Sequence, residues 1–255
     1  MHDLVSIIMP SYNTAQYIAA SIRSVQAQTY ENWELLIVDD CSTDNSDAVV
    51  APFLSDARIR YLKNEVNSGA AVSRNYALWE AKGRWIAFLD SDDLWHPEKL
   101  ERQIFFMEEV GCHFSYTYYQ EIDETSHPLG VTVQGPRHIT KAGMLRFCWP
   151  GCLTVMYDAD TVGPLQIPAI RKNNDYAMWL RVIERADCFL LPEVLAFYRR
   201  RSGSISNQSY GTLIKWHYRL FREAQGESLP CSVWHTAGNL LFGVYKKLRY
   251  VERRK

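Results

Sequence analysis

Short apolar runs alternate with longer segments of helical periodicity through the first 110 residues. The runs have the length of buried strands and lie at 4–9, 33–38, 59–62 and 85–89. The segments between them space their apolar residues as a helix does and lie at 15–28, 44–54, 72–81 and 97–110. This repeated strand–helix–strand order predicts a parallel sheet joined by right-handed crossovers. The expected fold class is therefore α/β.

The alternation ends in the second half of the chain. The expected elements there are strands at 114–119 and 152–157 and helices at 140–147 and 175–184. Two further apolar runs, at 188–191 and 194–198, are separated by Pro192 and predict two antiparallel or edge strands. The simplest division of the chain is one α/β domain over 1–208 and an amphipathic tail over 209–255.

The composition is that of a globular chain without a membrane span. At 255 residues the chain can bury a full core, and it has no run of 18 apolar residues, which a spanning helix needs. The apolar run at 4–9 is too short for a signal-peptide core and leads straight into Pro10. The six cysteines form no Cys-x-x-Cys pair, so we expect neither a zinc site nor a disulfide framework, which suits a reducing cytoplasm.

The charges are unevenly distributed along the chain. Residues 210–255 carry nine Lys/Arg against three Asp/Glu, whereas residues 1–209 carry nineteen against twenty-six. The tail also contains aromatic and aliphatic residues at helical spacing, which predicts basic amphipathic helices lying on an anionic membrane surface. The alternative is a pair of helices packed on the body or on a second subunit. The acidic body disfavours nucleic-acid binding.

Three carboxylates, those of Asp90, Asp92 and Asp93, follow the apolar run at 85–89. Ligands of open α/β sheets bind at the carboxyl ends of the strands, so this position is a candidate binding edge. Acids this close repel one another, and a divalent ion such as Mg²⁺ or Mn²⁺, completed by substrate phosphates, would offset the repulsion. The alternative is a solvated turn before the helix that Pro97 opens, with Asp92 or Asp93 as its cap.

The first two strand ends carry different chemistry. Pro10, Tyr12 and Asn13 follow the first strand without any glycine, which excludes both the dinucleotide-binding Gly-x-Gly-x-x-Gly turn and a P-loop. The ring of Tyr12 could stack on a base or serve ordinary packing. Asp39 and Asp40 lie too early to cap the next helix, and a carboxylate there could accept a hydrogen bond from an imide such as uracil N3–H.

Six short motifs in register resemble those of the family 2 glycosyltransferases with a GT-A fold. They lie at 9–13, 38–44, 67–75, 90–93, 174–181 and 198–206, so the resemblance covers about 1–206. It implies a Rossmann-like nucleotide-sugar-binding mixed sheet flanked by helices. It also implies a metal-dependent, inverting hexosyltransferase in which an acceptor hydroxyl displaces a nucleoside diphosphate, with Mn²⁺ or Mg²⁺ as cofactor.

The resemblance implies a role for each matching residue. Asp175 would be the catalytic base, and Asp90 and Asp92 would bind the metal. The nucleotide would be bound by Pro10, Tyr12, Asn13, Asp39, Asp40, Arg74 and Ser91. The diphosphate would be bound by Arg199, Arg201 and Ser204. Many relatives have Glu before the base; here the residue is Asn174, which leaves Asp175 as the only carboxylate of its segment.

These expectations describe an enzyme that moves a hexose or N-acetylhexosamine from a nucleotide sugar, taken as UDP-linked, to a lipid-linked or oligosaccharide acceptor. By family analogy the process is O-antigen or capsule assembly, and the enzyme would be cytoplasmic, peripheral on the inner face of the cytoplasmic membrane. One alternative is a sugar-nucleotide pyrophosphorylase, which would have a glycine-rich loop with a basic residue after the first strand. Another is a non-catalytic binding module of the same fold, which loss of Asp92 or Asp175 would favour.

Overall fold

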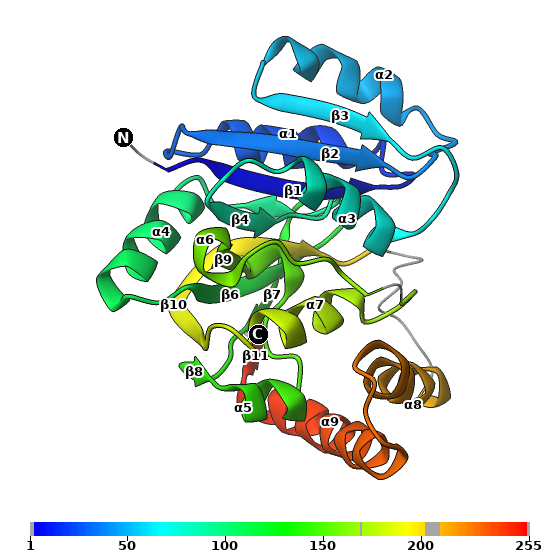
Figure 1. Ribbon diagram of the computed structural model, residues 1–255. Coiled ribbons are helices and arrows are strands. Elements are labelled where there is room, and N and C mark those ends of the chain that lie inside the picture. The colour runs from blue at the N-terminus through cyan, green and yellow to red at the C-terminus, as the bar shows by residue number, and fades with distance from the viewer. Residues whose placement is uncertain (1–2, 169, 202–209, 254–255) are drawn as a thin grey trace.

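The computed structural model describes residues 3–168, 170–201 and 210–253 (Figure 1). Within these residues an 11-stranded mixed sheet is flanked by helices on both faces. The main path of the sheet is β11-β7-β6-β9-β4-β1-β2-β3, and β10 pairs with β5, β6 and β8. The expected α/β class is confirmed.

The parallel strands of the first half form where the apolar runs predict them. They are β1 (Val5–Ser11), β2 (Trp33–Asp39), β3 (Ile59–Lys63) and β4 (Trp85–Phe88). β1 lies between β2 and β4, and β3 pairs with β2. Every residue of β1 and β2 is buried, which explains why their apolar runs are nearly continuous rather than alternating. Ser11 lies opposite Asp39, so the residues that follow both strands share one edge of the sheet.

The crossover helices are α1 (Ile18–Gln26), α2 (Ser46–Val50) with a 3₁₀ turn (Ala51–Ser55), α3 (Ala70–Glu80) and α4 (Lys99–Val110). α1 begins later than predicted because the carbonyl of Thr14 accepts the N–H groups of Tyr17 and Ile18 in a turn. Asn13, whose position just before the predicted helix at 15–28 makes it a plausible cap, does not cap this helix. Its backbone has a φ of 51°, and its side-chain oxygen accepts the Thr43 N–H from the second strand end at 2.8 Å.

The second half adds short strands and helices around a long one. They are β5 (Leu94–Trp95), β6 (Phe114–Ile122), β7 (Pro128–Val133), β8 (His138–Ile139), β9 (Met156–Asp158), β10 (Cys188–Arg199), α5 (Lys141–Arg146), α6 (Ala159–Val162) and α7 (Asn174–Val182). The strand expected at 152–157 is a 3₁₀ turn (Cys152–Thr154) followed by β9.

The two strands expected on either side of Pro192 are one strand, β10, which runs parallel to β6. Pro192 lies where the register shifts between Leu191 and Val194, so its missing N–H interrupts no ladder hydrogen bond. Irregular positions of this kind are where a strand accepts proline. The end of β10 also pairs with β5, which brings Arg199 beside the acidic segment that follows β4.

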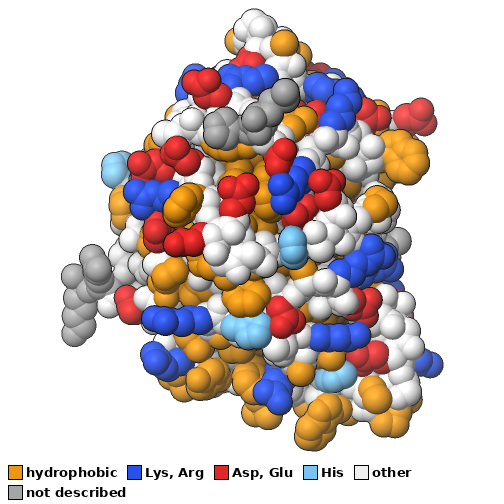
Figure 2. Space-filling model, turned by 60° about the vertical axis from the view of Figure 1, so that its left-hand side comes forward, with side chains coloured by type: hydrophobic (Ala, Val, Ile, Leu, Met, Phe, Trp, Pro, Cys, Tyr) orange, Lys and Arg blue, Asp and Glu red, His pale blue; other side chains and the backbone are white. Residues whose placement is uncertain are grey.

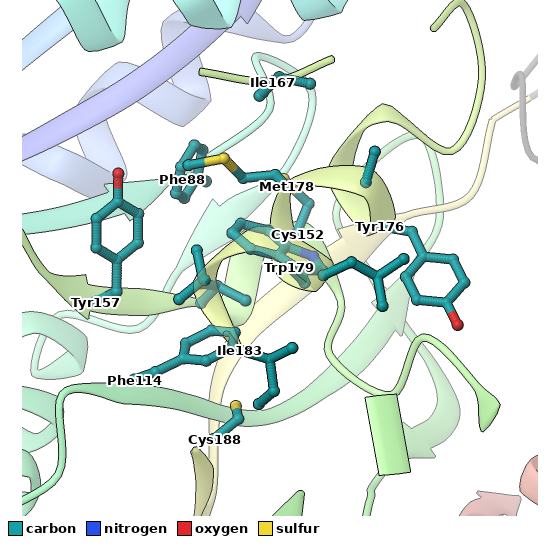
Figure 3. Packing of buried hydrophobic residues seen from close by; sticks show 14 of the residues in the cluster. Phe88, Phe114, Cys152, Tyr157, Ile167, Tyr176, Met178, Trp179, Ile183 and Cys188 are labelled. Carbon is teal, nitrogen blue, oxygen red and sulfur yellow. The ribbon is translucent and has the colours of Figure 1, made fainter. Parts of the chain in front are cut away.

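Two apolar clusters lie on opposite faces of the sheet. Alternate residues of β1 divide between them, with Ile7 in one cluster and Ile8 in the other. The cluster of Ile8 contains Phe88 and Trp179, whose rings meet edge to face with centroids 5.1 Å apart (Figure 3). Trp179 is fully buried, so α7 is fixed against β4 and its first residues have a set position relative to the sheet edge.

The tail consists of α8 (Tyr210–Arg219), a π-helical turn (Leu220–Ala224), α9 (Leu229–Arg249) and β11 (Val251–Arg253). Phe221 is fully buried with its ring 6.1 Å from that of Tyr176 in α7, and β11 pairs with β7. One side of the tail therefore packs on the body. Among the described residues, no helix is both long enough and apolar enough to span a membrane.

Candidate functional site

The acidic segment after β4 lies at the carboxyl edge of the sheet, as predicted. Ser21 of α1 holds its backbone, since the Ser21 hydroxyl lies 3.0 and 2.7 Å from the carbonyl oxygens of Ser91 and Asp93. The Ser91 hydroxyl is buried and accepts a hydrogen bond from Thr14 at 2.9 Å. Ser91 thus supports the segment from inside the protein, and its side chain is not placed to contact a nucleotide.

Asp92 forms an ion pair with Arg201, whose Nε lies 2.7 Å from Asp92 Oδ2. Burial raises the pKa of Asp92, and the charge of Asp90 acts in the same direction while Arg201 opposes both. Burial, followed by the charges of Asp92 and Asp90, raises the pKa of Asp93 well above its usual range. The three carboxylates therefore repel one another, and added positive charge would be favourable among them.

Asp90 and Asp92 have the chemistry to bind a hard divalent cation. Their side chains are 32% and 18% exposed, whereas Asp93 is buried and accepts the Arg199 backbone N–H at 2.8 Å. In the part of the chain that the structure describes, no group of three or more His, Cys, Asp or Glu side chains could hold a metal by itself. Two carboxylates completed by substrate phosphates are the usual partial ligand set of Mg²⁺ and suit Mn²⁺. The residues fit such an ion as one bound together with its substrate.

Arg74 joins the acidic segment to the start of α7. This nearly buried side chain of α3 donates from Nη2 to Asp90 Oδ1 and from Nη1 to Asn174 Oδ1, the latter at 2.7 Å. Burial acts to lower the pKa of Arg74, but the charges of Asp90 and, more weakly, Cys152 and Asp175 outweigh it, so the pKa of Arg74 is raised. One guanidinium thus connects the predicted metal ligand Asp90 with the residue that precedes the predicted base.

Asp175 is half-buried in the first turn of α7. The helix starts here after Asn173, which has a φ of 57°, a left-handed conformation that Asn adopts more readily than most residues. An acid in the first helical turn is stabilised by the helix dipole, and this is compatible with a chemical role. The charge of Asp175 acts on Arg74 and on Cys152, so the carboxylate lies within electrostatic reach of the acidic segment.

Asp40 organises the loop at 64–69. Its Oδ1 accepts the side-chain N–H of Asn64 at 2.7 Å and the backbone N–H of Ser68 at 2.8 Å, and its Oδ2 accepts the Gly69 N–H at 2.7 Å. Gly69 has a φ of 89°, a conformation that favours glycine. A carboxylate has about four acceptor positions, so these three donors leave one acceptor position on this side chain, which is 4% exposed.

The other residues expected at the nucleotide lie around the same edge. Tyr12 is 47% exposed directly after β1, so its ring face is accessible for stacking, and Pro10 is buried within β1. Asn13 ties this turn to Thr43, as described above. Asp39 is buried, and its Oδ1 has no hydrogen-bond partner among the described residues. The structure therefore brings the exposed Tyr12 and Asn13 together at one edge of the sheet, with the buried Pro10, Asp39 and Asp40 beneath them.

Arg199 is buried, and its guanidinium binds the protein itself. Its Nε donates to the Asp92 carbonyl oxygen at 2.7 Å, and its Nη1 donates to two carbonyl oxygens of the β6–β7 turn at 2.9 and 3.1 Å. Arg199 therefore fixes the acidic segment against that turn, which replaces the diphosphate contact that we expected. Arg201 is 28% exposed beside Asp92 and remains available to an anion. Ser204 lies outside the described residues.

The sequence analysis missed the supporting residues Thr14 and Ser21, and it missed the supporting role of Asp93. Each makes a hydrogen bond to a segment 70 or more positions away along the chain, so no local motif signals it. A hydroxyl residue just before a helix, such as Thr14, or within one, such as Ser21, is too common to indicate these contacts. The partners meet only in the folded sheet, where β1 pairs with β4 and β10 pairs with β5.

Known proteins are similar to this chain in sequence and in fold. Residues 6–153 match the profile described as Glycosyl transferase family 2. TuaG of Bacillus subtilis (strain 168), a protein named for teichuronic acid biosynthesis, is 40% identical over 233 residues, which cover 91% of this chain and 92% of TuaG. WfgD of Escherichia coli is 44% identical over 212 residues, or 82% of each chain. It is named a UDP-Glc:alpha-D-GlcNAc-diphosphoundecaprenol beta-1,3-glucosyltransferase.

Solved structures share the fold at low identity. TarS of S. aureus, crystallised with UDP-GlcNAc, superposes with a TM-score of 0.74 at 19% identity over 97% of this chain and 74% of its own. The mannosyltransferase PcManGT of Pyrobaculum calidifontis, in complex with GDP-Man and Mn²⁺, has a TM-score of 0.65 at 14% identity over 98% of this chain and 71% of its own. These similarities confirm the architecture that the motifs predicted, whereas neither a pyrophosphorylase nor a non-catalytic module is supported.

Proposed function

The chain belongs to glycosyl transferase family 2, and on this premise we propose that it is an inverting, metal-dependent enzyme that uses a UDP-sugar. It transfers a hexose or N-acetylhexosamine to a hydroxyl of a lipid-linked saccharide during assembly of a surface polysaccharide. The name of WfgD, which states a UDP-linked donor and a diphosphoundecaprenol-linked acceptor, supports both classes of substrate. The name of TuaG supports the polysaccharide context.

The observation that carries this proposal is the bridge made by Arg74. It binds Asp90 on the donor side and Asn174, the neighbour of Asp175, on the other. A displacement at an anomeric carbon needs the leaving diphosphate and the base on opposite sides of the reacting sugar. The bridge holds the residues for these two tasks in one frame, and both carboxylates are partly exposed, since Asp175 is half-buried and Asp90 is 32% exposed.

Asp175 acts as the general base in this proposal. Its carboxylate takes the proton of the acceptor hydroxyl while the hydroxyl oxygen bonds to the anomeric carbon and the bond to the diphosphate oxygen breaks. A single displacement of this kind inverts the anomeric configuration, so an α-linked nucleotide sugar gives a β-linked product. Removing a general base typically costs about 10²–10⁴-fold in rate.

Positive charge at the diphosphate comes from two sources. We assign the β-phosphate to Arg201, which is partly exposed and paired with Asp92, and we withdraw Arg199 from this role because its donors are used within the protein. A divalent ion held by Asp92 and Asp90 would supply further charge for the departing diphosphate. The presence of Mn²⁺ with GDP-Man in PcManGT supports this assignment.

Base recognition is assigned to the edge formed by Tyr12 and Asp40. The exposed ring of Tyr12 offers a face for stacking, and the remaining acceptor position of Asp40 suits the N3–H of uracil. Cytosine presents an acceptor at N3 in place of this donor. The site therefore discriminates between the two pyrimidines by hydrogen-bond direction.

We place the enzyme in the cytoplasm, peripheral on the inner face of the cytoplasmic membrane. A lipid-linked acceptor requires the site to work close to a bilayer, and the basic tail over 209–255 provides charge for contact with anionic lipids. The six free thiols are compatible with a reducing compartment. The division into a catalytic domain over 1–208 and this tail belongs to the same proposal.

The test is a donor panel of UDP-, GDP- and dTDP-sugars, assayed for slow hydrolysis and for transfer to a short soluble acceptor with Mn²⁺ present. We expect UDP-sugars to be preferred and Asp175→Asn to lower transfer by about 10²–10⁴-fold with UDP affinity nearly unchanged. Asp160→Asn, which alters an exposed acid of α6, is the matched control. A variant at 175 that keeps more than about a tenth of the rate would place the base elsewhere.

A further inference from the structure

The side of α9 that packs on the protein contains polar residues together with Phe242, whose ring centroid lies 6.2 Å from that of Trp149, and an apolar stripe faces outward. The fully or largely buried positions of this helix within the described chain include Ser232, Thr236 and Asn239. The exposed positions include Trp234 at 77%, Leu241 at 72% and Leu248 at 82%. At 3.6 residues per turn, each of these two sets forms a continuous stripe, and the stripes lie on roughly opposite sides of the helix. Ordinary surface helices have the reverse arrangement.

Specific polar contacts fix this orientation. Asn239 donates to the Leu145 carbonyl oxygen of α5 at 3.1 Å, and the ammonium of the half-buried Lys246 donates to the Trp149 carbonyl oxygen at 2.8 Å. Gly243 lies so close to Phe147 that a Cβ would meet its ring at 3.2 Å. Turning the apolar stripe inward would break these hydrogen bonds and leave the Leu145 and Trp149 carbonyl oxygens without these donors, which is costly for polar groups at a packed interface. The exposure of the stripe is therefore built into the fold.

Basic side chains flank the exposed stripe. Lys247 and Arg249 are exposed on either side of it, and Val233 and Val244 widen it. Figure 2 shows apolar side chains gathered with Lys and Arg at the lower end of the molecule, which is the end where Figure 1 places α9. An apolar stripe with aromatic residues and basic flanks matches a lipid surface with anionic headgroups. A second copy of this chain would bring like charges together.

We propose that this stripe, formed by Val233, Trp234, Leu241, Val244, Tyr245 and Leu248, is a membrane seat that inserts α9 in the plane of an anionic bilayer. The biological role of this membrane contact rests on the proposed function, because a lipid-linked acceptor presents its hydroxyl close to the bilayer. The seat is peripheral, because no described helix can span a membrane.

The seat is joined rigidly to the catalytic helix. Tyr176, the neighbour of Asp175, packs against Phe221 of the tail and donates a hydrogen bond to the Met144 carbonyl oxygen of α5 at 2.6 Å. α5 in turn accepts the Asn239 hydrogen bond from α9. In Figure 1 the arrowheads of β1 and β2 point to the side on which α8 lies. Seating α9 on a bilayer would therefore fix the height of Asp175 above it.

The test compares two charge-neutral double variants of the full chain. Trp234→Gln with Leu241→Gln removes the centre of the seat. Trp79→Gln with Phe105→Gln, which alters side chains 80% and 65% exposed on α3 and α4, is the matched control. We expect wild-type protein to sediment with vesicles of phosphatidylcholine and phosphatidylglycerol more than with phosphatidylcholine alone, and to be released by salt. The seat variant should bind at least about tenfold more weakly, and the control should bind like wild type.

Two further measurements separate the possible outcomes. Thermal unfolding should be similar in all proteins because the altered side chains are exposed, and Leu248→Gln repeats the test if the double variant is unstable. Transfer to a short soluble acceptor should be the same in the seat variant as in wild type. If no protein, wild type included, transferred a sugar to that acceptor, the proposed function would be refuted and the vesicle-binding result would still stand. Equal sedimentation of seat variant and wild type, or a wild-type dimer that the seat substitutions dissociate, would overturn the membrane seat.

Discussion

Replacing Lys99 by Met should stabilise the protein, and the gain should depend on pH. Lys99 is fully buried in α4, and its ammonium has no hydrogen-bond partner among the described residues. Burial lowers the pKa of Lys99 from 10.5 to about 7. A pKa difference of this size lowers the free energy of unfolding by about 5 kcal/mol at a pH where the lysine is charged in both the native and the unfolded protein.

One contact opposes this penalty. Lys99 Nζ lies 4.1 Å from the centre of the Trp95 ring, and a desolvated cation–π contact is worth about 2 kcal/mol. The free energy of unfolding of the Lys99→Met variant is therefore expected to exceed that of wild type by about 3 kcal/mol at pH 6.5. Between the folded and unfolded pKa values the unfolded chain binds more protons than the native protein, so native stability rises with pH over that window. The advantage of the variant should accordingly fall to about 1 kcal/mol by pH 9.5.

The assay is urea unfolding of both proteins at pH 6.5, 8 and 9.5, with Lys82→Met as the control because Lys82 is exposed. The control should change stability by less than about 0.5 kcal/mol at every pH. If Lys99→Met were destabilising at pH 6.5, or if its gain were the same at all three pH values, the ammonium would not be an uncompensated buried charge.

Three other substitutions test the site and the tail. Asp40→Asn should weaken UDP binding by about 1–2 kcal/mol and reduce the UDP-over-CDP preference, measured by calorimetry; an unchanged preference would detach Asp40 from the base. Asp92→Asn should abolish transfer and weaken UDP binding far more in Mn²⁺ than in EDTA, and wild-type activity that survives EDTA would contradict the metal site. Phe221→Ala should cost about 3–5 kcal/mol in urea unfolding because its ring is fully buried, whereas a loss below about 1 kcal/mol would mean that the tail is loosely attached.

The sequence determined the parallel half of the sheet and the edge at which the site forms. Buried strands need continuous apolar residues, and their carboxyl ends expose the polar residues that follow, so Asp40 and the acidic segment could be placed from local pattern alone. β10 could not be predicted as one strand, because Pro192 is acceptable only where the register against β6 happens to shift.

Tertiary structure decided which of these polar residues face the site. Arg199 and Arg201 are equivalent in sequence, and only the proximity of the β6–β7 turn gives one of them buried carbonyl partners while the other remains near the edge. The same holds for α9. Its amphipathic pattern was visible in the sequence, but the side that faces outward depends on hydrogen bonds to the carbonyl oxygens of Leu145 and Trp149 from a segment about a hundred residues earlier. The amphipathic pattern alone fits both a helix on a membrane and a helix packed on the body, because a local pattern shows that two faces differ and not what each face contacts.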